Sequence, residues 1–207
     1  LPLIFLKRLS EVTERYAWIV YAYCLMGNHF HLLIRTVKAN ISQSMRQLNG
    51  TYAQYFNKRH ARVGHIFEGR YKAILIRDED RLLVAARYIV LNPVRAGLVD
   101  SPDAWPWSSF RGTAGLDKPP HFLRPDQVLC NFSNRGDEAR REYVAFVLQG
   151  IGEESPFQDA RGGIILATKE SAREVFDNIV GDISSEVPRR ERFAARLELE
   201  EIFSSFG

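Results

Sequence analysis

The fold is decided by one stretch of the sequence, Tyr21-Ala-Tyr-Cys-Leu-Met-Gly-Asn-His-Phe-His-Leu-Leu-Ile-Arg-Thr36. Gly27 and Asn28 tolerate the positive φ angles that a tight hairpin turn requires. The stretch therefore predicts two antiparallel strands, at about 18–25 and 29–36, joined by a short turn.

The triplet His29-Phe30-His31 lies just after this turn. Because side chains alternate between the two faces of a strand, His29 and His31 point to one face and Phe30 to the other, towards a core. Two imidazoles on one sheet face are suitable ligands for a metal ion. The alternative is a pair of surface or hydrogen-bonded histidines without a metal.

The composition is that of an ordinary globular protein, with 207 residues of which 45% are hydrophobic and 26% charged. This length allows one core, or one domain with a smaller appendage. No apolar run approaches membrane-spanning length, and two cysteines do not make a disulfide framework. We expect a protein of the reducing cytoplasm, without a membrane partner.

Positive charge is concentrated in the middle of the chain. Between Arg46 and Arg95 there are ten basic and four acidic residues, so this window has a net charge of +6 in a chain of net charge +3. A basic middle indicates a polyanion as the partner.

Hydrophobic periodicity predicts further elements around the hairpin. These are helices at 3–16, 41–58 and 79–91, and a strand at about 70–77. Asn40 and Gln43 form a capping box for the second helix. Asp78 is expected to cap the third helix, and Asn92-Pro93 to end it. Gly97 is expected to stop any further helical turn, and Trp105-Pro-Trp107 to pack back on the domain.

This order predicts an α+β fold, a ferredoxin-like antiparallel sheet with helices on one face, without its usual opening strand. We expect an N-terminally incomplete domain at 1–115 and a mostly helical extension at 116–207, with helices near 137–149, 169–180 and 197–203. The missing strand would lie near the sheet centre, which predicts an exposed groove or strand edge beside the hairpin.

Three polar residues share one face of the helix predicted at 79–91. Tyr88 and Asn92 are four residues apart, and Arg81 precedes Tyr88 by seven. If this face covers the two histidines, the imidazoles and the Asn92 oxygen can hold Mg²⁺ or Mn²⁺, and the Tyr88 phenolate can attack a phosphodiester in line. The more common roles are a half-buried tyrosine, a residue at a helix end and a solvated arginine.

Four motifs resemble one family. The stretches Cys24-Leu-Met-Gly-Asn-His-Phe-His-Leu-Leu-Ile34, Arg62-Val-Gly-His-Ile-Phe-Glu-Gly-Arg-Tyr-Lys-Ala-Ile-Leu75, Arg87-Tyr-Ile-Val-Leu-Asn-Pro-Val-Arg-Ala-Gly-Leu-Val99 and Trp105-Pro-Trp-Ser-Ser109 are similar to the REP-associated tyrosine transposases. These belong to the insertion-sequence two-hundred group of single-tyrosine transposases with an HUH motif (histidine, hydrophobic, histidine). The resemblance covers about residues 15–112.

The resemblance implies a role for each matching residue. His29 and His31 correspond to the metal-binding histidines, Asn92 to the third ligand and Tyr88 to the nucleophile. The family cleaves single-stranded DNA beside hairpins and leaves a 5′-phosphotyrosine and a free 3′-hydroxyl. Its members act as monomers or homodimers. This chain has Gly27 where the family usually has proline, and residues after 150 resemble an extension that leads into a helix-turn-helix.

The basic window combines charge for phosphates with rings for bases, as single-stranded DNA binding requires. The candidate DNA-binding residues are Arg59, Arg62, Arg70, Lys72, Arg77, Arg81 and Arg95, interleaved with Tyr52, Tyr55, Phe67 and Tyr71. Alternatively, Tyr52 and Tyr55 are core residues. His65 could be a fourth metal ligand, a DNA contact or a solvated side chain.

Three functions fit these observations. The first is a metal-dependent DNA strand transferase and endonuclease that acts through Tyr88. The second is a catalytically inactive or truncated protein that only binds hairpin DNA. The third is a metallonuclease in which water replaces the tyrosine.

Overall fold

The computed structural model describes residues 1–76, 79–155, 157, 165 and 166. The chain forms two compact units, one of residues 1–66 with 83–156 and the other of residues 67–82 with 157–207. The helices expected at 169–180 and 197–203, and also Arg77 and Asp78, lie outside the described residues. The domain boundary expected at 115 stays a prediction.

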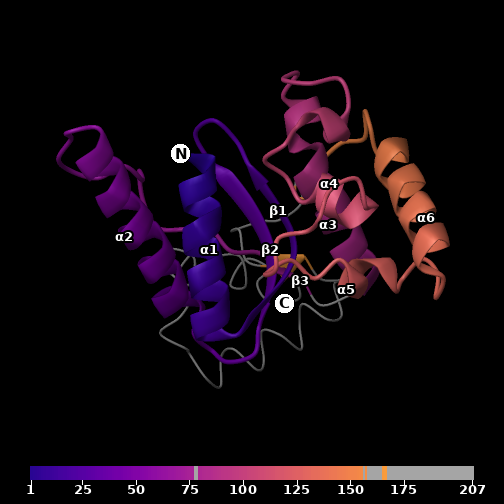
Figure 1. Cartoon of the computed structure of the whole chain (residues 1–207), viewed down its shortest axis with the longest axis horizontal. Helices are drawn as coiled ribbons and strands as arrows, with labels where there is room; N and C mark the ends of the chain where they lie inside the picture. The colour runs from indigo at the N-terminus through magenta and orange to yellow at the C-terminus, as the bar shows by residue number, and fades with distance from the viewer. Residues whose placement is uncertain (77–78, 156, 158–164, 167–207) are drawn as a thin grey trace, which may run out of the picture. The chain divides into compact units, whose positions relative to one another are not determined.

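The helices and strands follow the predicted order (Figure 1). They are α1 (Pro2–Tyr16), β1 (Trp18–Leu25), β2 (Phe30–Thr36), α2 (Ile41–Arg59), β3 (Leu75–Ile76), α3 (Glu79–Arg95), the 3₁₀ turn η1 (Pro102–Ala104), α4 (Phe110–Ala114), α5 (Asp126–Leu129), α6 (Gly136–Gln149) and β4 (Ile165–Leu166). The predictions of α1, the hairpin, α2 and the helix near 137–149 are confirmed within a few residues.

The hairpin of β1 and β2 is antiparallel, and Cys24 lies opposite His31. The register shifts between Val20 and Ala22, which makes a β-bulge at Tyr21. Seven of the eight residues of β1 are buried, whereas β2 is mostly half-exposed. The first strand of the hairpin therefore forms the centre of the core.

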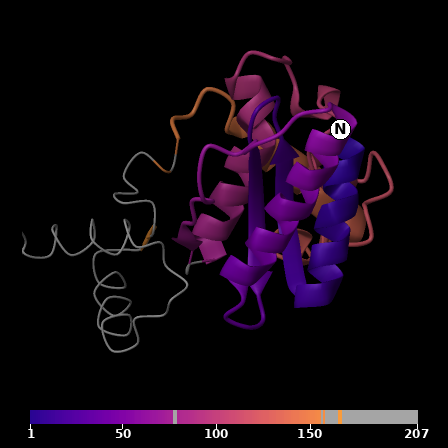
Figure 2. The same ribbon diagram turned by 90° about the vertical axis from the view of Figure 1, so that its left-hand side faces the viewer.

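One face of the hairpin packs on α1 and α2 (Figure 2). The ring of Phe5 lies 4.6 Å from that of Phe30 and 5.3 Å from that of Tyr52. Tyr52 thus takes part in the core. The predicted α+β class is confirmed, and α3 lies on the opposite side of the hairpin from α1 and α2 (Figure 1).

Segments from later in the chain cover the outer edge of β1. The amide of Leu25 donates to the Trp107 carbonyl at 2.9 Å, and the amide of Ser109 donates to the Tyr23 carbonyl at 2.9 Å. The Trp105 indole donates to the Leu25 carbonyl at 3.0 Å, so the predicted aromatic anchor is confirmed.

The opposite edge of the hairpin is open in the described part of the chain. There, β2 pairs with β1 alone, in a sheet of two strands. This agrees with the expected strand edge beside the hairpin.

The prediction of a strand at 70–77 is wrong in its length. Of the described residues 70–76, Leu75 and Ile76 alone are in strand conformation, and they pair in parallel with Ile165 and Leu166 of β4. In the ferredoxin-like plan this strand would pair with the opening strand near the sheet centre. Because the described sheet has no such strand, the segment lacks the long partner that a ladder of eight residues needs.

The predicted capping box at α2 is also wrong. Asn40 precedes α2, but its side chain makes no cap hydrogen bond. The side-chain nitrogen Nδ2 donates instead to the Tyr16 carbonyl at 3.2 Å, so Asn40 connects the start of α2 to the end of α1.

Helix α3 does not end at Asn92 as predicted, but passes through Pro93 to Arg95. Proline lacks the amide that would donate to the Ile89 carbonyl, four residues back. The Asn92 side-chain nitrogen lies 3.5 Å from that carbonyl, where it can replace the missing donor. Gly97, at φ 65°, then closes the helix, as predicted, with the Leu98 amide donating to the Pro93 carbonyl.

Candidate functional site

The two histidines lie together at the end of the hairpin. Their ring centroids are 5.0 Å apart, with the planes at 89°. His29 is exposed and precedes β2 directly, and its carbonyl accepts a 2.8 Å hydrogen bond from the Met26 amide. The turn thus holds both rings on one side of the hairpin, as the spacing predicts.

Their surroundings leave both imidazoles able to bind a cation. His29 Nδ1 lies 2.7 Å from Asn28 Oδ1, which can only accept, so in the neutral imidazole this nitrogen carries the proton and Nε2 has the lone pair. Burial, with a smaller effect of His29, lowers the pKa of His31 to about 4. His31 is therefore neutral at neutral pH, the form in which an imidazole binds a metal.

Helix α3 brings Tyr88 to the histidines. The Tyr88 ring lies 6.0 Å from that of His31, nearly perpendicular to it. Tyr88 is half-buried. This partial exposure fits a phenol that reacts with a substrate better than it fits a tyrosine of the core. The expectation that this helix face covers the histidine face of the hairpin is thereby met.

Asn92 lies one turn beyond Tyr88 on the same helix. Its side-chain nitrogen donates to the Tyr88 carbonyl at 2.9 Å. Since this bond and the contact with the Ile89 carbonyl occupy the nitrogen, Oδ1 remains the atom that could bind a cation.

No group of three or more His, Cys, Asp or Glu side chains able to hold a metal occurs in the part of the chain that the structure describes. His65 is exposed in the loop after α2 and does not complete such a group with His29 and His31. Asn92 on α3 offers a side-chain oxygen as a further possible ligand.

Arg95 is the predicted DNA-binding residue that the structure places against Tyr88. Its guanidinium carbon lies 5.1 Å from the centroid of the Tyr88 ring. The two residues are seven apart on α3, so helical periodicity could have identified this contact. The sequence reasoning assigned Arg95 to DNA alone.

The other candidate basic residues divide between the two units. Arg59 and Arg62 are exposed at the C-terminal end of α2 and in the following loop. Arg70, Lys72 and Arg81 belong to the second unit, and Arg77 lies outside the described residues.

Two residues of this region were missed by the sequence reasoning. Arg87 precedes Tyr88 and forms an ion pair with Glu153, in the segment after α6. The two residues are 66 positions apart. No local pattern connects them, so only the folded chain identifies the pair.

The region of the chain that contains the histidine pair and Tyr88 is similar to known proteins. The family model described as "Transposase IS200 like" matches residues 4–92, which include both histidines, Tyr88 and Asn92. A protein of Haemophilus influenzae named "Putative REP-associated tyrosine transposase" is 30% identical over 112 residues, which cover 49% of this chain and 64% of that relative.

No solved structure matches the chain. Among the described residues, no helix is both long and apolar enough to cross a membrane. Residues 4–92, which carry the histidine pair and Tyr88 on facing elements, are thus similar to the IS200-like transposases.

Proposed function

We propose that this protein is a metal-dependent DNA strand transferase that cleaves single-stranded DNA beside hairpins, with Tyr88 as the nucleophile. The observation that carries the proposal is the position of the Tyr88 ring, 6.0 Å from His31 and on the side of the hairpin that bears both histidines. The similarity to transposases in this region supports DNA as the substrate.

In the proposed reaction, the Tyr88 oxygen forms a bond to phosphorus while the bond between phosphorus and the 3′ oxygen breaks. The phenol loses its proton, and the departing 3′ oxygen gains one. The products are a 5′-phosphotyrosine and a free 3′-hydroxyl. An aryl phosphate ester retains enough reactivity for a DNA hydroxyl to reverse the step, which joins strands.

His29, His31 and Asn92 would hold Mg²⁺ or Mn²⁺. The donor set fits such an ion, since His31 is neutral at neutral pH, and the Asn92 nitrogen is engaged by a helix carbonyl. When bound, the ion would polarise the phosphodiester. The protein's own contribution is to keep the phenol beside the scissile phosphate.

The exposed Arg59 and Arg62 are proposed to bind phosphates along the strand. Because such binding releases counterions, affinity should fall steeply with salt. Neutralising Arg62 should weaken binding to all sequences by a similar factor.

The test is a labelled single strand that contains a hairpin, incubated with Mn²⁺ and separated under denaturing conditions. Wild type should form a covalent protein–DNA adduct, and Tyr88→Phe should form none while it still binds the strand. Tyr55→Phe is the matched control, because it removes the same oxygen from α2 and should leave the adduct unchanged.

The other outcomes identify the alternatives. Free cleaved DNA without an adduct would indicate hydrolysis by water. Binding without any cleavage would indicate an inactive protein that only recognises hairpin DNA. An adduct in Tyr88→Phe would mean that another residue is the nucleophile.

A further inference from the structure

The segment after α6 lies against the helix that bears Tyr88. Together they enclose a small hollow of about 30 Å³, whose lining includes Tyr88, Arg95 and Glu153. This segment lies more than fifty residues beyond Tyr88 in the chain, and residues 4–92, the region that matches the family, do not include it.

Glu153 binds two arginines of α3 with two different groups. Its carboxylate forms an ion pair with Arg87, and its backbone carbonyl accepts a hydrogen bond from Arg95. The side chain of Glu153 thus attaches the segment to α3, and the attached backbone then presents a carbonyl to Arg95.

Arg87 is held firmly by several contacts. Its guanidinium lies 4.5 Å from the centroid of the Phe146 ring, and its Nη1 donates to the Phe146 carbonyl at 3.5 Å. A Cβ at Gly150 would lie 2.6 Å from Arg87 Cδ, so any larger residue there would displace this side chain from its present path. Arg87 therefore acts as the anchor of the segment on α3.

Arg95, in contrast, reaches towards the candidate nucleophile. Its guanidinium lies over the Tyr88 ring, with the carbon 5.1 Å from the centroid. A cation over a ring restrains the ring's orientation and attracts its π electrons. It would also stabilise the negative charge that develops as the phenol loses its proton.

We propose that Arg95 and Glu153 are positioning residues for Tyr88, with Arg87 as the anchor that makes the arrangement possible. The inference rests on the proposed function of Tyr88. The carbonyl of Glu153 holds Arg95 over the ring, and Arg95 orients the phenol for in-line attack. The segment after α6 is thereby part of the catalytic apparatus.

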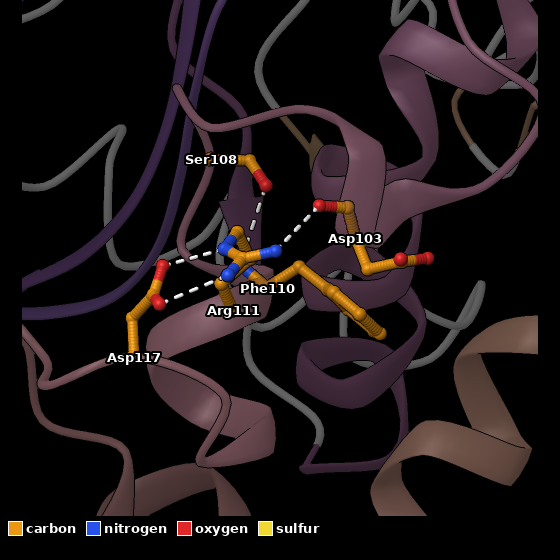
Figure 3. A network of polar contacts seen from close by, with 5 residues as sticks. All are labelled: Asp103, Ser108, Phe110, Arg111 and Asp117. Carbon is orange, nitrogen blue, oxygen red and sulfur yellow. Dashed lines mark hydrogen bonds and ion pairs between the residues drawn. The ribbon is translucent and has the colours of Figure 1, made fainter.

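A second arginine–carboxylate pair in the same unit supplies a matched control (Figure 3). The Arg111 guanidinium contacts both carboxylate oxygens of Asp117 and the Asp103 carbonyl. The side chains of Asp117 and Glu153 are each 53% exposed. Asp117→Ala and Glu153→Ala therefore each remove a carboxylate from a similar environment, but only the second pair is linked to Arg95.

The kinetic experiment measures single-turnover adduct formation with hairpin DNA and Mn²⁺. At saturating DNA, Glu153→Ala and Arg95→Ala should each lower the rate constant by about tenfold. The DNA concentration that gives half of the maximal rate should change less. A variant with both changes should be no slower than the slower single variant, since each change disrupts the same contact, that of Arg95 with Tyr88. Arg95→Lys should recover part of the rate, and Asp117→Ala should match wild type.

A second measurement does not depend on activity. In NMR spectra, the ring current of Tyr88 should displace the Arg95 side-chain signals. Glu153→Ala should remove this displacement, and Asp117→Ala should preserve it.

Three results would overturn the inference. These are Arg95 signals that Glu153→Ala leaves unchanged, a double variant in which the two losses multiply, and faster adduct formation in Glu153→Ala. The last result would mean that the segment obstructs Tyr88. Absence of an adduct in wild type would overturn the proposed function itself, and the NMR signals would then show separately whether Glu153 holds Arg95 in place.

Discussion

The two faces of the hairpin are made of adjacent residues but have different surroundings. Phe30 packs with Phe5 of α1 at 4.6 Å, in an apolar layer closed by α2. His31, the next residue, faces Tyr88 of α3. The alternation of a strand thus separates a face that stabilises the fold from a face that presents polar groups to a substrate.

The largest change in stability should come from the apolar face. Phe5→Ala removes a side chain that is 3% exposed, and large-to-small changes of this kind cost about 3–5 kcal/mol. Leu3→Ala on the same helix is the control, because Leu3 is 69% exposed and its loss should cost less than about 0.5 kcal/mol. Denaturant unfolding measures both, and similar costs would contradict the assignment of the two helix faces.

Changes on the other face should affect metal binding more than stability. His31→Gln should lower Mn²⁺ affinity by about tenfold or more, because loss of even an outer-sphere partner of a ligand costs ~10–100-fold. Its effect on unfolding should be well below that of Phe5→Ala. Isothermal titration calorimetry supplies the affinity, with His121→Gln as the control, since His121 contacts Ser10 and Glu14 on α1.

The smallest expected effect concerns the reactivity of Cys24, which tests how far the histidine face of the hairpin is accessible to a reagent in solution. Cys24 lies opposite His31, so its side chain is on the same face, but it is 0% exposed, and burial raises the pKa of its thiol to about 12. Near pH 8 its thiolate is therefore scarce, and iodoacetamide should modify the exposed Cys130 alone until the protein unfolds.

Mass spectrometry would follow the two thiols. Equal modification of Cys24 and Cys130 in the folded protein would mean that the face is accessible along the strand and not only at the hairpin end.

The periodicity of the sequence correctly predicted which residues share a face of one helix or one strand. Strand alternation placed His29 and His31 on one side, and helical spacing placed Tyr88 and Asn92 on one face of α3. The assumption that these faces meet came from the plan of the fold, and the 6.0 Å distance between the His31 and Tyr88 rings agrees with it.

Contacts between distant residues could not be predicted in this way. The pairing of Ser109 with Tyr23 spans 86 residues, and that of Arg87 with Glu153 spans 66. Neither has a period that a sequence window could detect. The predicted end of α3 at Asn92-Pro93 was wrong for a different reason. The side chain of Asn92 can supply the hydrogen-bond donor that proline lacks.

The central claim is that Tyr88 becomes covalently attached to DNA, and peptide mapping of the wild-type adduct tests it most directly. After nuclease digestion and trypsin, cleavage following Arg87 and Arg95 releases the peptide 88–95, in which Tyr88 is the only tyrosine. The account predicts that this peptide carries the mass of the residual nucleotide. A nucleotide on the peptide that contains Tyr52 and Tyr55, with peptide 88–95 unmodified, would contradict it.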